Sequence, residues 1–309
     1  MPGWVPFTGL TAVVVLLLLG LARLSQRAVS DQPALPDGDE PIATPETPVG
    51  GERERADPPS AMESARAETP STESTAPDAV AADGDAVTSS GERAAEPEPA
   101  RPVDESASTT PKFSTGALLA NVALTQGLFG AILAVGAWYY EIPLWALGLT
   151  ETAVGTGTLA VGIGIVFGVL LWTANEISAT VADAAGATYD ESLREMLAPD
   201  TLPGWVLLLG VILPIIAVVE ELLFRAALIG VPAAGFGISP LALAIFSSAL
   251  FALGHGAQGR VGIAVTGGLG LVLAGGYILT GSLLVVVIAH YLVNALEFLV
   301  HEGIGADRI

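Results

Sequence analysis

The sequence contains no cysteine, a single lysine (Lys112) and only three histidines. The lack of cysteine excludes disulfide bonds and metal sites built from thiolates. Basic residues are few altogether, 12 against 32 acidic ones. Nucleic-acid surfaces need basic patches, and none is present. We therefore expect no nucleic-acid partner.

The acidic residues are concentrated in one part of the chain. A formal net charge of -20 and a mean hydropathy of +0.61 rarely occur together in one soluble domain, which indicates two unlike parts. Residues 31–105 hold 19 Asp or Glu and 5 Arg, a net charge of -14. Residues 26–113 are also rich in Pro, Ala, Ser and Thr, and such a composition buries too little apolar surface to offset the entropy of ordering. We predict that this segment is a disordered acidic linker.

The N-terminal segment is almost wholly apolar over residues 4–22, which is long enough to span the hydrocarbon core of a bilayer. A cleaved signal peptide is the rival interpretation, and it normally has a positive segment before the apolar run. Here no charged side chain precedes the run, while Arg23 and Arg27 follow it. This pattern favours an uncleaved transmembrane anchor at residues 1–25.

Apolar stretches return after the linker. Two short segments, 141–149 and 184–197, are typical of interfacial or loop helices. The sequence therefore predicts an all-α fold, a polytopic transmembrane helical bundle with six core spans in residues 114–302. The N-terminal anchor and the acidic linker precede this domain, and a tail at 303–309 follows it. The six predicted spans are 116–139, 155–174, 202–229, 240–254, 261–279 and 283–300.

The basic residues predict how the chain is oriented, because they are enriched on the cytoplasmic side of membrane proteins. Threading seven spans leaves the loops 141–151 and 230–239, which lack Lys and Arg, on the opposite side. We therefore expect a multi-pass protein of the plasma membrane with its linker and C-terminus in the cytoplasm. The residues that fall on that side are Arg23, Arg27, Lys112, Arg194, Arg260 and Arg308.

Ionisable side chains inside membrane spans are costly to bury, so each is a functional candidate. In the third core span, Glu221 and Arg225 are spaced i,i+4 and can pair on one helix face, which suits a structural role. Glu220 is turned by about 100° from Glu221 and has no partner within its helix. The spacing thus assigns Glu220 to chemistry as a general base, with a second structural carboxylate as the alternative.

The other candidates lie on later spans. Phe251 and His255 end the fourth core span, and His290 with Asn294 places an imidazole and an amide on one face of the sixth. Glu297 and His301 continue that face, and we expect them to mark the helix end in water. At about 1.5 Å per residue, Glu220 lies ~14 Å from the outer end of its span, His290 ~12 Å, Asn294 ~18 Å and His255 ~24 Å. These side chains converge only if a helix tilts or the span boundaries shift by a turn or two.

Together these residues resemble, in order and spacing, the three motifs of the CPBP family. This family comprises the type II CAAX prenyl endopeptidases and the bacteriocin-processing or immunity proteins. Its pattern is Glu-Glu-x-x-x-Arg, then Phe-x-x-x-His, then His-x-x-x-Asn. The resemblance covers roughly residues 114–301 and excludes the anchor and the linker. The matching residues are Glu220, Glu221 and Arg225, then Phe251 and His255, then His290 and Asn294.

The resemblance implies an intramembrane endopeptidase of the hydrolase class that acts on a membrane-associated protein or peptide. By that likeness, Glu220 and His255 would activate the attacking water. His290 and Asn294 would stabilise the oxyanion. The remaining motif residues would support them, and whether the substrate is prenylated stays open.

A metal and two other classes of function remain open as well. The family is commonly labelled metalloprotease, and Glu220, His255 and His290 would suit a catalytic zinc site with an open position. The three come from separate spans and no His-Glu-x-x-His helix is present, which favours a metal-free mechanism without a cofactor. A catalytically silent scaffold or immunity-type protein would bind a partner through the same pocket. An ion or proton carrier would use the buried carboxylate, although the chain shows no repeated halves.

Overall fold

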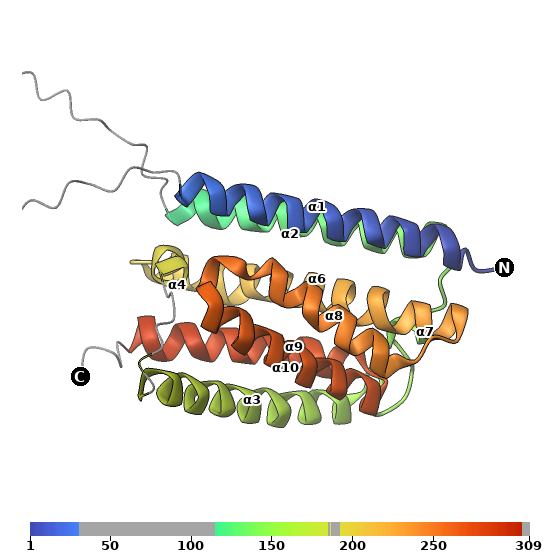
Figure 1. The fold of residues 1–309 in the computed structure, drawn as a ribbon. Helices are drawn as coiled ribbons and strands as arrows, with labels where there is room; N and C mark the ends of the chain where they lie inside the picture. The colour runs from blue at the N-terminus through green and yellow to red at the C-terminus, as the bar shows by residue number, and fades with distance from the viewer. Residues whose placement is uncertain (31–114, 185, 187–191, 305–309) are drawn as a thin grey trace, which may run out of the picture. The chain divides into compact units, whose positions relative to one another are not determined.

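The computed structural model describes residues 1–30, 115–184, 186 and 192–304, and these all belong to one compact unit. The described residues form helices and no strands, which confirms the all-α prediction (Figure 1). The predicted linker lies outside the described residues except for its first few positions. Lys112 and Arg308 also lie outside them.

Six helical segments among the described residues are long and apolar enough to cross a membrane, the N-terminal one included. A seventh apolar helix, α8 (Pro240–Gly254), is shorter. The protein is therefore a multi-pass membrane protein. The six segments are α1 (Trp4–Ser30), α2 (Thr115–Tyr139), α3 (Thr158–Ala184), the continuous run α5–α7 (Leu202–Phe236), α9 (Gly259–Thr280) and α10 (Leu283–Glu297) with η5 (Phe298–Gly303).

The run from α5 to α7 is longer than the sequence predicts. It was expected to end at residue 229, but it continues to Phe236. Pro214 and Pro232 both lie in it, each just after a stretch of π-helix. Proline lacks an N–H and its ring clashes with the carbonyl four residues earlier, and the wider π turn relieves both problems. The elements of the run are α5 (Leu202–Leu207), η2 (Leu208–Ile212), α6 (Leu213–Glu221), η3 (Leu222–Gly230) and α7 (Val231–Phe236).

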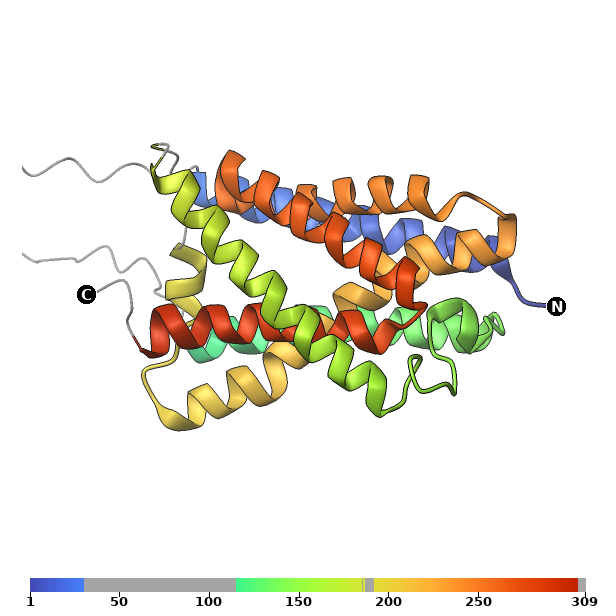
Figure 2. The same cartoon turned by 90° about the horizontal axis from the view of Figure 1, so that it is seen from below.

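The helices are arranged in layers (Figure 1). α1 and α2 run side by side on one face, α6 and α8 lie next to them, and α9 and α10 follow. α3 crosses obliquely over α10 on the far side, as Figure 2 shows, and also contacts α9. This crossing is close, because a Cβ atom at Gly168 of α3 would lie only 2.9 Å from the Cα atom of Ala289 of α10. α10 is thus held between α3 and α6.

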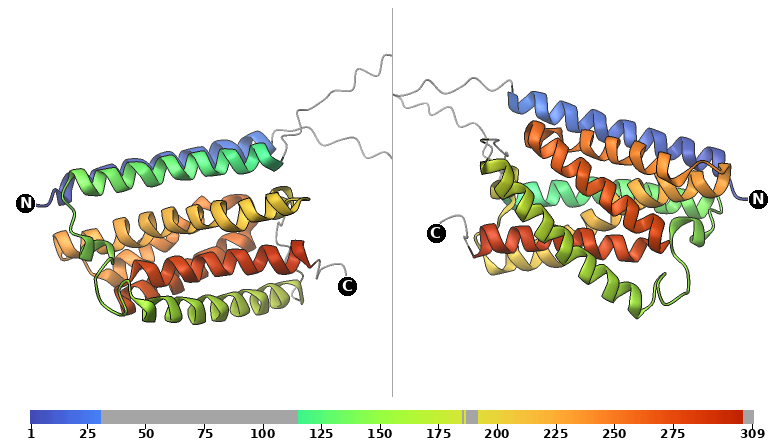
Figure 3. Two further views of the ribbon diagram at one scale, coloured as in Figure 1. Left: turned by 180° about the vertical axis from the view of Figure 1, so that it is seen from behind. Right: turned by 60° about the horizontal axis from the view of Figure 1, so that its bottom comes forward.

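Successive helices reverse direction, so the connections gather at two ends of the bundle (Figure 3). The N-terminus meets the end of α2 through a hydrogen bond from the Gly3 N–H to the Tyr140 carbonyl, 2.7 Å long. At the other end, Arg194 of α4 (Ser192–Leu197) bonds to Glu302 of η5 at 3.0 Å. The remaining short elements are η1 (Leu144–Leu147) and η4 (Gly256–Gln258). The helices thus alternate in direction, as the predicted topology assumed. Which end of the bundle faces the cytoplasm stays a prediction.

Candidate active site

Glu221 is the centre of the buried polar group. Its Oε1 atom accepts a hydrogen bond from Nη1 of Arg225 at 2.9 Å and lies 2.7 Å from Nδ1 of His290. Glu221 and Arg225 are 0% and 1% exposed. Arg225 also donates from Nη2 to the carbonyl of Gly270 at 3.0 Å. The ion pair expected from the i,i+4 spacing is present, and through it α6 and η3 are linked to α10 and α9.

Phe251 lies beside this pair and fixes the neighbouring histidine. The Arg225 guanidinium carbon lies 4.8 Å from the centre of the Phe251 ring, a cation–π distance. The Phe251 carbonyl is 2.8 Å from Nδ1 of His255. A carbonyl oxygen only accepts hydrogen bonds, so Nδ1 carries the proton and Nε2 of the neutral ring presents a lone pair. The main-chain carbonyl of Phe251 therefore fixes the tautomer of His255, while the Phe251 ring packs against Arg225.

Glu220 differs from Glu221 in having an oxygen atom without a partner. Its Oε1 accepts from Nε2 of Gln126 at 3.4 Å. Its Oε2 is buried, has no hydrogen-bond partner among the described residues, and lies 3.7 Å from Nε2 of His290. The residue as a whole is 9% exposed. A buried carboxylate oxygen with spare acceptor capacity is suited to binding a water molecule and taking its proton.

The four residues predicted to be catalytic line a single cavity of about 130 Å³. A water in the liquid occupies ~30 Å³, so the cavity has room for a few water molecules. The structure thus brings together, from three helical segments, side chains that are far apart in sequence. Their roles remain predictions. The lining comprises Glu220, His255, His290 and Asn294 with Asn175, Ile216, Phe251, Gln258, Val265, Thr266, Leu269, Val293 and Glu297.

The structure also explains the mismatch in predicted depth. Because its helix continues to Phe236, Glu220 lies about 24 Å from that end at ~1.5 Å per residue, the same depth as His255. α10, in contrast, starts further inside the bundle than that end. The N–H of its first residue, Leu283, donates to the Gly148 carbonyl at 3.0 Å, and Ser282 is fully buried. The loop around η1 therefore covers the start of α10, and His290 lies deeper than its count from Leu283 predicts.

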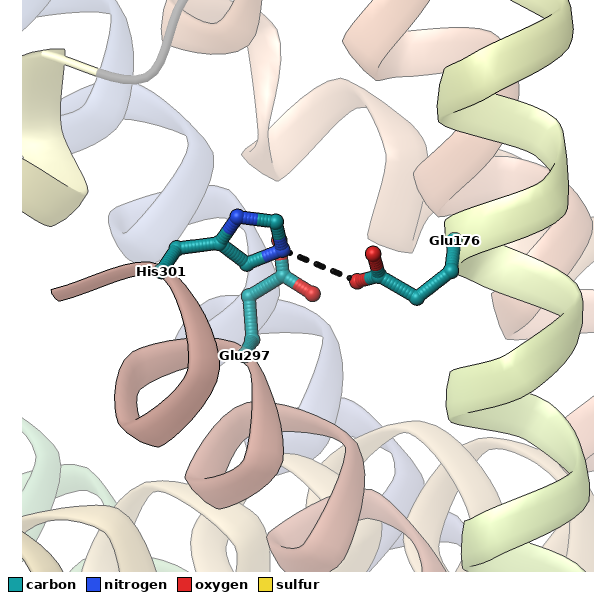
Figure 4. A group of neighbouring side chains, drawn as sticks. All are labelled: Glu176, Glu297 and His301. Atoms are coloured by element: carbon teal, nitrogen blue, oxygen red, sulfur yellow. Dashed lines mark hydrogen bonds and ion pairs between the residues drawn. The ribbon is translucent and has the colours of Figure 1, made fainter. Parts of the chain in front are cut away.

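Glu297 and His301 are not a helix end in water, contrary to the expectation from the sequence. Nε2 of His301 is 3.0 Å from Glu176 of α3 and 3.9 Å from Glu297 (Figure 4). Arg194 bonds to Glu297 at 2.8 Å. These ion pairs form because α3 and α4 pack against this end of α10, which the periodicity of one helix cannot show. The ligand atoms of Glu176, Glu297 and His301 all lie within 4.8 Å of one another, but Glu297 is already paired with Arg194.

The fit of zinc to the predicted ligands is incomplete. In both His255 and His290, Nδ1 lies within hydrogen-bond distance of a fixed acceptor, as is usual for histidines that bind a metal through the other nitrogen. However, the possible ligand atoms of Glu220, His255 and His290 do not all lie within 4.8 Å of one another. As arranged here, the three do not make a three-ligand zinc site, so no step below is assigned to a metal.

Sequence reasoning missed Gln126, which contacts Glu220 from α2, and Gly270, whose carbonyl binds Arg225. Gln126 carried a signal, because it is a polar side chain within an apolar span. A larger cavity of about 740 Å³ lies between α2, α6 and α10, and its lining is apolar apart from Glu141 and Thr156. It contains none of the predicted site residues.

Apolar helices packed around buried carboxylate and imidazole groups define a polytopic membrane protein with a polar site inside its bundle. Residues 202–296 match the family model described as type II CAAX prenyl endopeptidase Rce1-like. The match runs from α5 into α10 and therefore includes every residue of the three motifs. Such a domain in a helical membrane protein supports an intramembrane protease. Comparisons with curated proteins and with solved structures gave no match.

Proposed function

We propose that the protein hydrolyses peptide bonds of a membrane-associated protein or peptide, with a water molecule activated by Glu220. The observation that carries the proposal is the unpartnered Oε2 atom of Glu220, which lies in one cavity with His255, His290 and Asn294. Amide hydrolysis needs a base for the water and donors for the developing oxyanion. The four side chains supply both kinds of group.

In this mechanism a water molecule lies between Glu220 and His255. Glu220 takes one proton as the water oxygen bonds to the carbonyl carbon of the substrate. Nε2 of His255 holds the other hydrogen of the water, because Nδ1 is bonded to the Phe251 carbonyl. The proton on Glu220 then passes to the leaving nitrogen as the carbon–nitrogen bond breaks, which returns Glu220 to the carboxylate.

His290 and Asn294 stabilise the oxyanion in the proposed mechanism. Nδ1 of His290 donates to Glu221, so Nε2 donates as well only when the ring carries both protons. The amide of Asn294 is the second donor. Glu221 and Arg225 thereby act as positioning residues for His290.

Comparative proteomics of membrane peptides tests the proposal directly. We expect peptides with new termini in cells that make the full-length protein, and their loss in cells that make Glu220→Gln at equal membrane abundance. The exposed carboxylate Glu141, replaced in Glu141→Gln, serves as the matched control and should leave the peptides unchanged. Identical peptide sets from wild type and Glu220→Gln would favour a silent scaffold over a protease.

The same cells report the proposed plasma-membrane location and cytoplasmic C-terminus if a tag is added at the C-terminus.

Chelation is expected to leave cleavage unchanged within about twofold, because the preferred mechanism uses no metal. The measurement is the cleavage rate of purified protein before and after incubation with a strong zinc chelator and dialysis. The catalytic histidines and the glutamate would bind zinc if they moved together, so the test must include re-addition of zinc. Loss of activity on chelation with recovery on zinc would overturn the metal-free mechanism while leaving the protease function in place.

A further inference from the structure

A second cavity, of about 270 Å³, ends on the same catalytic pair. Glu220 and His255 line both cavities, but the remaining walls differ. The polar cavity is completed mainly by α9 and α10, whereas this one is completed mainly by α1 and α2, the layer on the opposite side of α6 and α8 (Figure 1). Its other lining residues are Leu18, Leu21, Ala22, Thr125, Gln126, Phe129, Phe224 and Gly254.

α1 is a fixed part of this wall, although it lies outside the residues that match the family. Phe7 and Thr11 are fully buried against the bundle. A Cβ atom at Gly235 of α7 would lie 2.7 Å from the Trp4 ring, and at the other end of α1 the side chain of Leu18 reaches Gly254 of α8. The helix is therefore seated along its length, and its side chains occupy defined positions in the cavity.

The lining indicates what the cavity binds. Apart from Glu220 and His255 it carries no ionisable group, and most of its surface comes from aliphatic and aromatic side chains. Its volume lies just below the ~300–1,000 Å³ of pockets for small-molecule ligands. It is therefore suited to a single large apolar side chain, placed directly beside the proposed water-activating pair.

Gln126 supplies a polar contact at the edge of this apolar space. A carboxylate only accepts hydrogen bonds, so the amide nitrogen of Gln126 faces Glu220 and its carbonyl oxygen faces away. That oxygen, Oε1, is buried and finds no hydrogen-bond donor in the described part of the chain. Buried acceptors are normally satisfied, and a backbone N–H of a bound peptide is a donor that the apolar walls lack.

We infer that the cavity between α1 and α2 is a substrate subsite, and this inference rests on the proposed function. It takes the apolar side chain of a residue next to the bond that is cleaved, while Oε1 of Gln126 accepts a backbone N–H of the same peptide. The first helix is then a determinant of specificity. The substrates are membrane-associated segments with a large apolar residue beside the scissile bond.

The test changes the size of the cavity in both directions. Full-length protein in phospholipid vesicles is given a proteome-derived peptide library, and cleavage sites are read by mass spectrometry. Ala22→Trp fills the cavity and should lower cleavage beside Leu and Phe by about tenfold or more, as expected for size changes in apolar pockets. Leu21→Ala enlarges it and should increase cleavage beside Trp. Leu17→Trp, a matched change at an α1 residue that is 54% exposed and outside the cavity, should leave the profile unchanged.

A second measurement tests Gln126. A well-cleaved library peptide is resynthesised with single N-methyl groups at successive positions. At one position N-methylation should lower kcat/KM of the wild type by about tenfold, the scale of one lost hydrogen bond of about 1.4 kcal/mol. Gln126→Leu should be slower on the unmethylated peptide and insensitive to methylation at that position. Gln126→Asn, which keeps the acceptor, should be intermediate.

The outcomes separate the two proposals. If the wild type cleaves no more library peptides than Glu220→Gln does, the proposed function fails and the subsite falls with it. If the wild type cleaves peptides and the Leu21→Ala profile matches that of Leu17→Trp, the subsite is overturned while the protease function stands. Leu21 is half exposed, so this variant decides the question even if Ala22→Trp does not fold.

Discussion

Cleavage by Glu220→Gln is expected to fall by about 10²–10⁴-fold, the usual contribution of a general base, with no loss of stability. Glutamine keeps an oxygen at Oε1, which still accepts from Gln126. The group that replaces Oε2 enters a position that has no hydrogen-bond partner among the described residues, so no bond is lost there. Removing a buried, incompletely paired charge also lowers its desolvation cost. The rate should therefore fall while the unfolding temperature stays the same or rises.

The measurement pairs single-turnover cleavage with thermal unfolding in one detergent. Glu221→Gln is the informative comparison, because that carboxylate is bonded to Arg225 and to His290. It should lower both rate and stability. A Glu220→Gln variant that unfolds earlier than wild type and cleaves at a reduced rate would instead assign Glu220 a structural role. Full cleavage by Glu220→Gln would remove it from the mechanism altogether.

Local spacing was enough to predict the pairing inside one helix. Glu221 and Arg225 are four residues apart, and helical geometry places them on one face whatever surrounds the helix. The same holds for the all-α fold, because long apolar runs leave helices as the main way to satisfy backbone groups in a bilayer. These features depend on short-range geometry or on composition, and the sequence contains both directly.

Features that depend on contacts between helices could not be predicted. The contact from Gln126 to Glu220 joins residues 94 positions apart, and no periodicity relates them. The depth of His290 depends on the loop around η1 covering the start of α10. His301 was assigned to water because one helix shows neither Glu176 nor the neighbouring ion pairs. In each case the missing information is which helices become neighbours, and this is decided by packing.

Arg225→Met is expected to destabilise the fold by about 3–5 kcal/mol, the cost of leaving a buried charge without its partner. Glu221 is 0% exposed, so its carboxylate cannot turn to water once the guanidinium is gone. The variant also loses the bond to the Gly270 carbonyl and the stacking against Phe251. Methionine is unbranched and of similar length, so the space itself stays largely filled. Thermal unfolding and the amount of folded protein in the membrane measure the loss.

The double variant Glu221→Gln with Arg225→Met distinguishes lost charge balance from lost packing. Both variants lack the guanidinium, but in the double variant position 221 no longer holds a buried charge, and the glutamine oxygen still accepts from Nδ1 of His290. If the buried charge dominates, the double variant should be more stable than Arg225→Met by about 1–3 kcal/mol, the range of coupling between contacting residues. Equal stability of the two would assign the loss to packing against Phe251 and Gly270. The double variant still lacks the hydrogen bond from Arg225 to the Gly270 carbonyl, so cleavage should recover less than stability does if the ion pair positions His290 as well as stabilising the fold.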